Sequence, residues 1–169
     1  MKKGEIMKQY VIIGNGVAAA GCVEGIRSVD KEGKIVIVSK EKYPVYCRPL
    51  ISYYLEGKTG LDRINYRPDD FYNANNCGVL YGKTAEKIDH KEKQVVLSDN
   101  KAIPYTALCV AAGSSPIALP FEGISTVSRK FNFTTLDDAL ELEKTVNGES
   151  RVLIIGAGLI GLKCAEGLH

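Results

Sequence analysis

The chain has 169 residues and a net charge of +2, and 45% of its residues are hydrophobic. This length allows one well-packed core with an appendage, and the composition is typical of a globular protein. The scattered lysines give no reason to expect a nucleic-acid partner. No apolar run reaches the roughly 18–20 residues that span a bilayer, and the run after the basic N-terminus is too short for a signal peptide. We therefore expect a cytoplasmic protein with no membrane partner.

A glycine-rich motif follows the first predicted strand. Residues 9–13 form an apolar run suited to the centre of a parallel sheet, and Gly14-Asn-Gly16-Val-Ala-Ala19 comes directly after it. Residues 16–28 favour a helix and residues 34–39 a second strand, which completes a βαβ unit. In a dinucleotide-binding fingerprint the first glycine turns tightly, the second lets the backbone approach a pyrophosphate, and the third small residue lets helix and strand pack. The pyrophosphate then lies at the helix N-terminus, where the dipole favours negative charge.

The middle of the chain is irregular and rich in strand patterns. Tyrosines cluster around Arg48 and Pro49. Further along, proline and acidic residues predict a helix start within 67–72. The next patterns predict short strands at 78–81, 84–89 and 94–97, a turn at Asp99-Asn100, and a strand at 105–111. From Phe133 to Val146 the apolar spacing predicts a helix that ends at Asn147-Gly148.

A second fingerprint lies near the end of the chain. It reads Arg151-Val-Leu-Ile-Ile-Gly156-Ala-Gly158-Leu-Ile-Gly161, again an apolar run followed by a helix pattern. Two fingerprints indicate two nucleotides in one enzyme. Because the chain stops soon after the second, we expect that nucleotide domain to be incomplete. Its strand and helix should pack poorly without their sheet partners.

The five cysteines form neither a C-x-x-C pair nor a zinc pattern, so we expect no metal site and a reducing compartment. Cys22, Cys109 and Cys164 lie in apolar patterns typical of small core residues. His90 and His169 are isolated in the sequence.

Four landmarks in this order resemble the FAD-dependent pyridine nucleotide-disulfide oxidoreductase superfamily. They are the Gly14 fingerprint, Tyr46-Cys-Arg-Pro-Leu-Ile-Ser52, Val110-Ala-Ala-Gly-Ser-Ser-Pro116 and the Gly156 fingerprint. The second resembles the branch of NADH:rubredoxin reductases, ferredoxin reductases and the flavin region of nitrite reductase large subunits. The resemblance implies an α/β fold. Residues 1–116 would form a Rossmann-like FAD-binding domain with a parallel sheet and a β-rich insertion. Residues 117–148 would form a connecting segment and a helix. Residues 149–169 would be the truncated start of a Rossmann-like NAD(P)H-binding domain.

The resemblance also implies the cofactor-binding residues. Gly14, Gly16 and Ala19 would hold the FAD pyrophosphate, and Glu41 would accept hydrogen bonds from the adenine ribose. Arg48, beside Pro49, would lie along the pyrophosphate and flavin, where a guanidinium gives bidentate recognition. The remaining implied positions are Ala85 at the adenine, Ala111, Ala112 and Gly113 where the chain crosses the cofactor, and Gly156, Gly158 and Gly161 at NAD(P)H.

Three positions depart from the family pattern. Tyr53 stands where members often have a lysine near the flavin, and Ala112 replaces the threonine of an A-T-G segment. Lys163 stands where members usually have a glutamate close to the nicotinamide. The last change reverses a charge and bears directly on the NAD(P)H geometry.

The resemblance implies hydride transfer from NAD(P)H to FAD, with electrons then passed to a redox protein such as rubredoxin or ferredoxin. One alternative is an NADH oxidase or disulfide reductase with Cys47 as a redox thiol beside Arg48. Against it, the C-x-x-x-x-C motif is missing, and matching Tyr53-Tyr54 to the single-cysteine members puts their cysteine at Pro49. A second alternative is a nucleotide-binding module without turnover. In each case we expect this chain alone to be inactive, because most of the family's NAD(P)H domain is absent from it.

Overall fold

The computed structural model describes residues 7–117 and 120–169, which divide into two compact units. The first unit contains the chain up to Tyr46 and the segment Asn65–Gly113. The second contains Cys47–Ile64 and Ser114–His169. The chain therefore leaves the first unit after Tyr46 and returns to it at Asn65.

Four parallel strands form the main sheet of the first unit, as predicted for an α/β fold. In sheet order they are β3 (Cys77–Tyr81), β2 (Lys34–Ser39), β1 (Gln9–Ile13) and β7 (Ala107–Val110). All three pairings are parallel. The predicted bounds of β1 and β2 are confirmed, because both are central strands made of continuous apolar, β-branched residues.

A smaller antiparallel sheet is the β-rich insertion that the sequence predicts. It consists of β4 (Ala85–Asp89), β5 (Gln94–Leu97) and β6 (Ala102–Pro104). The sequence patterns missed β6, and the strand predicted from Tyr105 begins instead at Ala107. The reason is that Ile103 pairs with Val95, so residues 102–104 belong to the antiparallel sheet, and the Tyr105 amide donates to Lys93 O at 2.8 Å just beyond it.

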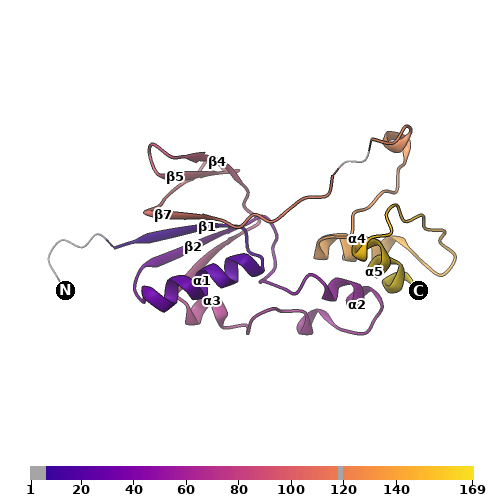
Figure 1. Ribbon diagram of the computed structural model, residues 1–169, viewed down its shortest axis with the longest axis horizontal. Coiled ribbons are helices and arrows are strands. Elements are labelled where there is room, and N and C mark those ends of the chain that lie inside the picture. Colours follow the sequence, from indigo (N-terminus) through magenta and orange to yellow (C-terminus); the bar gives the residue numbers. More distant parts are fainter. Residues whose placement is uncertain (1–6, 118–119) are drawn as a thin grey trace. The chain divides into compact units, whose positions relative to one another are not determined.

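The two faces of the parallel sheet are covered differently (Figure 1). Helices α1 (Val17–Val29) and α3 (Phe71–Ala74) lie on one face, and the small sheet lies on the other. The core on the helical side consists of Ile12, Ala19, Ala20, Val23, Ile35, Ile37, Val45 and Phe71. The core on the other side consists of Val11, Val36, Val38, Val95 and Leu97. Alternate residues of β1 and β2 thus enter opposite cores, as the two-residue period of a strand requires.

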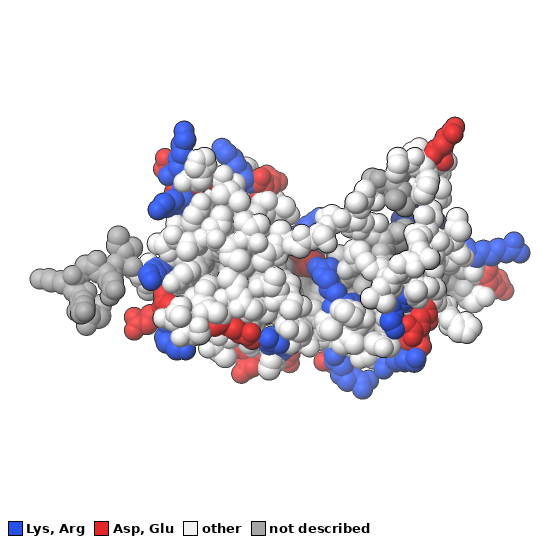
Figure 2. All heavy atoms as spheres, viewed as in Figure 1, with Lys and Arg blue, Asp and Glu red and all other residues white. Residues whose placement is uncertain are grey.

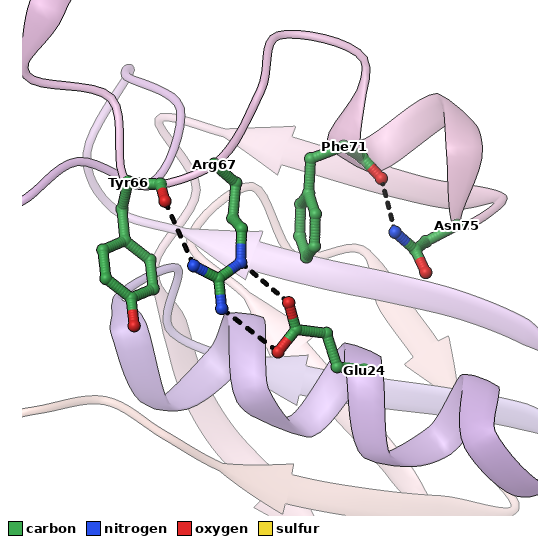
Figure 3. Close-up of polar contacts among 5 residues, drawn as sticks. All are labelled: Glu24, Tyr66, Arg67, Phe71 and Asn75. Atoms are coloured by element: carbon green, nitrogen blue, oxygen red, sulfur yellow. Dashed lines mark hydrogen bonds and ion pairs between the residues drawn. The ribbon is translucent and has the colours of Figure 1, made fainter.

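Arg67 holds the segment before α3 against α1 (Figure 3). Its Nε and Nη2 donate to the two carboxylate oxygens of Glu24 at 2.7 and 3.2 Å. Its guanidinium also lies 4.3 Å from the ring centroid of Tyr66. The helix start predicted within residues 67–72 is found at Phe71. Asn75 closes the short helix by donating from Nδ2 to Phe71 O at 2.8 Å.

Asp30 fixes the turn between α1 and β2. Its Oδ1 accepts from the amides of Glu32 and Gly33 at 2.9 and 2.8 Å, and its Oδ2 accepts from the Tyr10 hydroxyl at 2.8 Å. These hydrogen bonds, the one from Gly33 above all, lower the pKa of Asp30 to about 2. The charged carboxylate is therefore the form that stabilises the turn.

We expect Asp30→Asn to lower the urea midpoint of unfolding at pH 7. The ordinary carboxyl pKa is about 3.9, so the contribution of the charged form is complete above that value and is lost as pH falls through about 2. The gap in stability between wild type and variant should close over this pH range, measured by circular dichroism. Asp70→Asn is the control, because it changes an exposed carboxylate that makes no capping hydrogen bond to α3, and it should leave the urea midpoint at pH 7 unchanged. A gap of constant size from pH 5 to pH 2 would contradict the assignment.

The second unit is built on three short helices. They are α2 (Leu50–Leu55), α4 (Leu136–Thr145) and α5 (Leu159–Leu168), and α2 packs against both others. Single 3₁₀ turns lie at Leu61–Arg63 and Ile124–Thr126. The sequence patterns missed α2, whose tyrosines have modest helix propensity and whose stability comes from packing.

Helix α4 begins later than the predicted Phe133 because a capping box sets its start. The Thr135 hydroxyl accepts from the Asp138 amide at 3.2 Å, while Asp138 Oδ2 accepts from the Thr135 amide at 2.8 Å. Burial raises the pKa of Asp138, but the hydrogen bonds from Thr134 and Thr135 outweigh it and hold the pKa below its ordinary value. The T-x-x-D sequence is a recognisable start signal that periodicity alone overlooks.

Charged side chains of both signs are interspersed on the face shown in Figure 2. Among the helices of residues 7–117 and 120–169, none has the length and apolar character needed to cross a membrane.

Candidate dinucleotide-binding site

The first fingerprint forms the tight turn that its glycine predicts. Gly14 follows β1 with φ +106°, and its amide donates to Val38 O at 2.8 Å. A Cβ at Gly14 would lie 2.1 Å from the carbonyl oxygen of Ala111, which follows β7. Two predicted site segments, the Gly14 turn and the Ala111 segment, are therefore in direct contact.

Gly16 leaves open space at the start of α1. It occupies the N-cap position with φ −92°, and a Cβ there would meet no heavy atom of the described chain within 4 Å. No side chain caps the helix within the described residues, and its first turn carries no acidic residue. Uncapped amides, a helix dipole and unfilled space are the features that a pyrophosphate requires, so these residues fit the phosphates of a dinucleotide.

Ala19 plays the packing role that the fingerprint assigns to its third small residue. Its side chain is fully buried in the core between α1 and the parallel sheet. A larger residue would push the helix away from the sheet and displace the amides at its N-terminus.

Glu41 lies two residues beyond the end of β2, and its role as a ribose-binding carboxylate stays a prediction. Its Oε2 accepts from the Tyr46 hydroxyl at 2.5 Å, and its backbone oxygen accepts from Ser39 Oγ at 2.8 Å. The turn after β3 is hydrogen-bonded to the end of β2, because the Lys83 amide donates to Ser39 O at 2.9 Å. Ala85 follows two residues later as the first residue of β4, half-buried beside the second core.

The structure thus gathers the predicted residues of the first unit at the carboxyl end of the parallel strands. Gly14, Glu41 and Ala111 follow β1, β2 and β7 in turn. Ala112 lies beside the Gly14 turn, and Gly113 is exposed with φ +72°. In open α/β sheets this end is where ligands bind.

Arg48 and Pro49 belong to the second unit, and their roles toward a cofactor stay predictions. Pro49 is the N-cap residue of α2, which suits its fixed φ. Arg48 is exposed and donates from Nη1 to Thr134 O at 2.7 Å, which joins the start of α2 to the segment before α4. Cys47 is half-buried, and its amide donates to Ile64 O at 2.8 Å.

The strand predicted at the start of the second fingerprint is wrong. Arg151–Ile155 pairs with no described strand, and Leu153 is 85% exposed. A parallel strand forms only beside a partner, and the described residues provide none. The exposure agrees with the expectation that this segment packs poorly.

The turn and helix of the second fingerprint nevertheless form. Gly156 has φ +116°, Gly158 caps α5, and a Cβ at Gly161 would lie 2.1 Å from Gly156 O. A Cβ at Gly156, unlike one at Gly14, would meet no heavy atom of the described residues within 4 Å. The local geometry of the motif is present, but no described residue packs against Gly156 as Ala111 packs against Gly14.

Two of the departures from the family pattern meet in space, which sequence reasoning missed. Lys163 Nζ lies 5.0 Å from the ring centroid of Tyr53, and it also pairs with Glu166 at 2.5 Å. The hydrogen bond that Lys163 donates to Glu166 raises the pKa of Lys163. Helix α5 further rests on α2 through Gly167, where a Cβ would lie 2.9 Å from Ser52 O.

The cysteines of the described residues are free, and no group of three or more His, Cys, Asp or Glu side chains there could hold a metal ion. Burial and a hydrogen bond with Cys109 raise the pKa of Cys22 to about 11. Burial also raises the pKa of Cys164, which is 8% exposed. Cys164 is therefore a core residue, as predicted.

Comparison with known proteins identifies relatives along almost the whole chain. The epsilon subunit of NADH-dependent phenylglyoxylate dehydrogenase from Aromatoleum evansii is 35% identical over 161 residues, which are 95% of this chain and 38% of that protein. NADH-rubredoxin oxidoreductase from Clostridium acetobutylicum is 28% identical over 164 residues, 96% of this chain and 42% of that protein. The crystal structure of the covalent putidaredoxin reductase-putidaredoxin complex matches with a TM-score of 0.85 and 30% identity, covering 97% of this chain and 40% of that chain.

The chain spans about two fifths of the length of these relatives. A family model described as "Pyridine nucleotide-disulphide oxidoreductase" matches residues 8–169, which include both fingerprints. The chain belongs to the pyridine nucleotide-disulphide oxidoreductase family.

Proposed function

We propose that the protein is an FAD-dependent oxidoreductase that takes hydride from NADH or NADPH and passes electrons to a redox protein such as rubredoxin or ferredoxin. The observation that carries this proposal is the open, uncapped start of α1 at Gly16, with Glu41 at the end of the adjacent strand. Relatives named as a rubredoxin oxidoreductase and a putidaredoxin reductase support a protein acceptor. FAD, when bound, would accept two electrons as hydride from the nicotinamide and release them singly to the redox protein.

The residues of the chain would bind and orient the cofactor. Amides of the Gly14–Gly16 turn would hold the pyrophosphate, and Glu41 would accept hydrogen bonds from the ribose hydroxyls. Arg48 keeps the role of a pyrophosphate ligand that the resemblance gives it, with Pro49 at the start of its helix. Ala85 and the segment Ala111–Gly113 would contact the cofactor through their backbone. In the second fingerprint, Gly156, Gly158 and Gly161 would begin the NAD(P)H site within the proposed domain at 149–169.

The spectrum of the full-length gene product tests the proposal. We expect the purified protein to be yellow, to bleach when NADH or NADPH is added without oxygen, and to recover its colour when oxidised rubredoxin or ferredoxin is added. A colourless protein that takes up no added FAD would overturn the flavoenzyme assignment. A yellow protein that neither nucleotide bleaches would favour a binding module without turnover. Bleaching followed by oxidation only by oxygen or a disulfide would favour the oxidase or disulfide reductase.

Gly16→Ala should separate cofactor binding from folding. Because a Cβ at Gly16 meets no neighbour within 4 Å in the described chain and φ is −92°, the variant should fold with wild-type stability. The new methyl group would occupy space reserved for the pyrophosphate, so we expect FAD affinity to fall by about tenfold or more, a cost of ~1.4 kcal/mol. Calorimetric titration with FAD measures this.

Gly25→Ala is the matched control for Gly16→Ala. It also adds a methyl group in open space on α1, but on the exposed helix surface rather than at its N-terminus. It should leave FAD affinity unchanged. Equal affinities of both variants and wild type would refute the pyrophosphate site at Gly16.

A further inference from the structure

A buried tyrosine holds the carboxylate at the end of β2. Tyr46 is 6% exposed, and its hydroxyl donates to Glu41 Oε2 at 2.5 Å. A hydrogen bond from a hydroxyl to a charged carboxylate at this distance belongs to the strong class. A hydroxyl on an enclosed ring also has little freedom to move away from its acceptor. The contact therefore selects an orientation for a glutamate that is itself only half-buried.

The backbone that carries Tyr46 is anchored on two sides. Tyr46 forms an antiparallel bridge with Asn65, and the Tyr66 amide donates to Val45 O at 2.9 Å. The ring of Tyr43 contacts the ring of Tyr46 edge-on, with centroids 6.5 Å apart. The position of the Tyr46 hydroxyl is thus set by the fold of the first unit and not by the glutamate alone.

The same segment is also tied to the fingerprint turn. Asn15, between the two glycines, donates from Nδ2 to Tyr43 O at 3.2 Å. The Tyr72 hydroxyl donates to Asn15 Oδ1 at 2.9 Å and accepts from the Val45 amide at 2.8 Å. One short stretch, residues 43–46, therefore links the turn proposed to bind phosphate with the carboxylate proposed to bind ribose.

We propose that Tyr46 is a positioning residue for the adenosine half of the cofactor, and that it acts by holding Glu41 in its ribose-binding orientation. This inference rests on the proposed function, because it takes Glu41 as the ribose ligand. A side chain that is ordered before binding loses less conformational freedom when the ligand arrives, which raises affinity without any new contact. Tyr46 need not touch the cofactor for this effect.

A double-mutant cycle in the full-length protein, freed of flavin, tests the link. Tyr46→Phe keeps the ring and removes the hydroxyl, and it should weaken both FAD and ADP binding by about threefold to tenfold. Glu41→Ala should weaken both further. In the Glu41→Ala background, Tyr46→Phe should cost nothing, because its effect passes through the missing carboxylate.

Tyr54→Phe is the matched control. The Tyr54 hydroxyl also donates to a glutamate, Glu143, at 2.7 Å, but in the second unit and between α2 and α4. This variant loses the same kind of hydrogen bond and should bind ADP as wild type does. Glu41→Asp supplies a second test in case Tyr46→Phe fails to fold. It keeps the charge but withdraws the carboxylate from Tyr46, and it should weaken ADP binding.

The outcomes separate this inference from the proposed function. A wild-type protein that binds neither FAD nor ADP overturns both. Wild-type FAD binding that Tyr46→Phe leaves unchanged overturns only the role of Tyr46. If Tyr46→Phe lowers ADP affinity by the same factor with and without the Glu41 side chain, the hydroxyl serves the fold and not the orientation of Glu41. That result also overturns the role of Tyr46. If Tyr46→Phe does not fold, a Glu41→Asp variant with wild-type ADP affinity overturns it.

Discussion

Gly14→Ala should destabilise the first unit by about 3 kcal/mol or more, a large part of the 5–15 kcal/mol typical of a folded domain. The added Cβ would lie 2.1 Å from Ala111 O, so the chain leaving β7 would have to move away from β1. That movement would strain the pairing of β1 with β7, which continues to Ile13 opposite Val110. The φ of +106° adds strain, since residues with a Cβ rarely adopt it. Urea unfolding followed by circular dichroism measures the loss.

Two other glycines supply the controls for Gly14→Ala. Gly113 also has a positive φ, +72°, but a Cβ there meets no described atom within 4 Å, so Gly113→Ala should show the backbone strain alone, about 1 kcal/mol. Gly16→Ala should be neutral for folding. If Gly14→Ala costs no more than Gly113→Ala, the steric contact with Ala111 is not what requires glycine.

Arg27→Met should cost about 3 kcal/mol or more, the second large effect that we expect. Arg27 is 8% exposed on α1, and its guanidinium donates only to backbone oxygens among its described partners. These are Asn75 O at 2.7 Å, Gly33 O at 2.8 Å, Asp30 O at 3.0 Å and Asn76 O at 3.4 Å. Methionine fills most of the volume but removes the guanidinium donors from these carbonyls, which lie in the loops before β2 and β3. Among the described residues, Asn75 O would keep only the weak donor Cys77 Sγ at 3.4 Å.

The control for Arg27→Met is the same substitution at Arg129, which is exposed in the second unit. Arg129→Met should change the free energy of unfolding by less than about 0.5 kcal/mol. Arg27→Lys should lie between wild type and Arg27→Met, because an ammonium has fewer donors and cannot match the planar fork of arginine. A methionine variant as stable as wild type would mean that water replaces the guanidinium at these carbonyls.

The sequence predicted the elements that have strong local signals. β1 and β2 appear with their predicted bounds because continuous apolar runs leave no other placement. β6 and α2 were missed for different reasons. Ala102–Pro104 is too short to show a pattern, and α2 depends on packing against α4 and α5 for its stability. The strand at Arg151–Ile155 was predicted from its run of apolar residues, yet a strand also needs a neighbour.

The fingerprint predicted the position of the candidate site but not its internal connections. Gly14, Gly16 and Glu41 could be placed from the motif and the end of a strand. The contact of Tyr46 with Glu41 could not, because a tyrosine five residues away in an irregular segment reaches the carboxylate only after the chain folds back. The contact of the Lys163 ammonium with the Tyr53 ring could not be predicted either, since it joins residues on two helices distant in sequence.

The position of β1 between β2 and β7 has a consequence for synthesis on the ribosome. Gln9 and Thr106 exchange hydrogen bonds across 97 residues of sequence, so one edge of β1 stays unpaired until the segment around β7 has emerged. An open edge of a parallel sheet is a template for mispairing, and pairings between distant segments form slowly. Chains stalled between β3 and β7 would therefore be the aggregation-prone species, and the closing of β7 onto β1 would be the late step of folding.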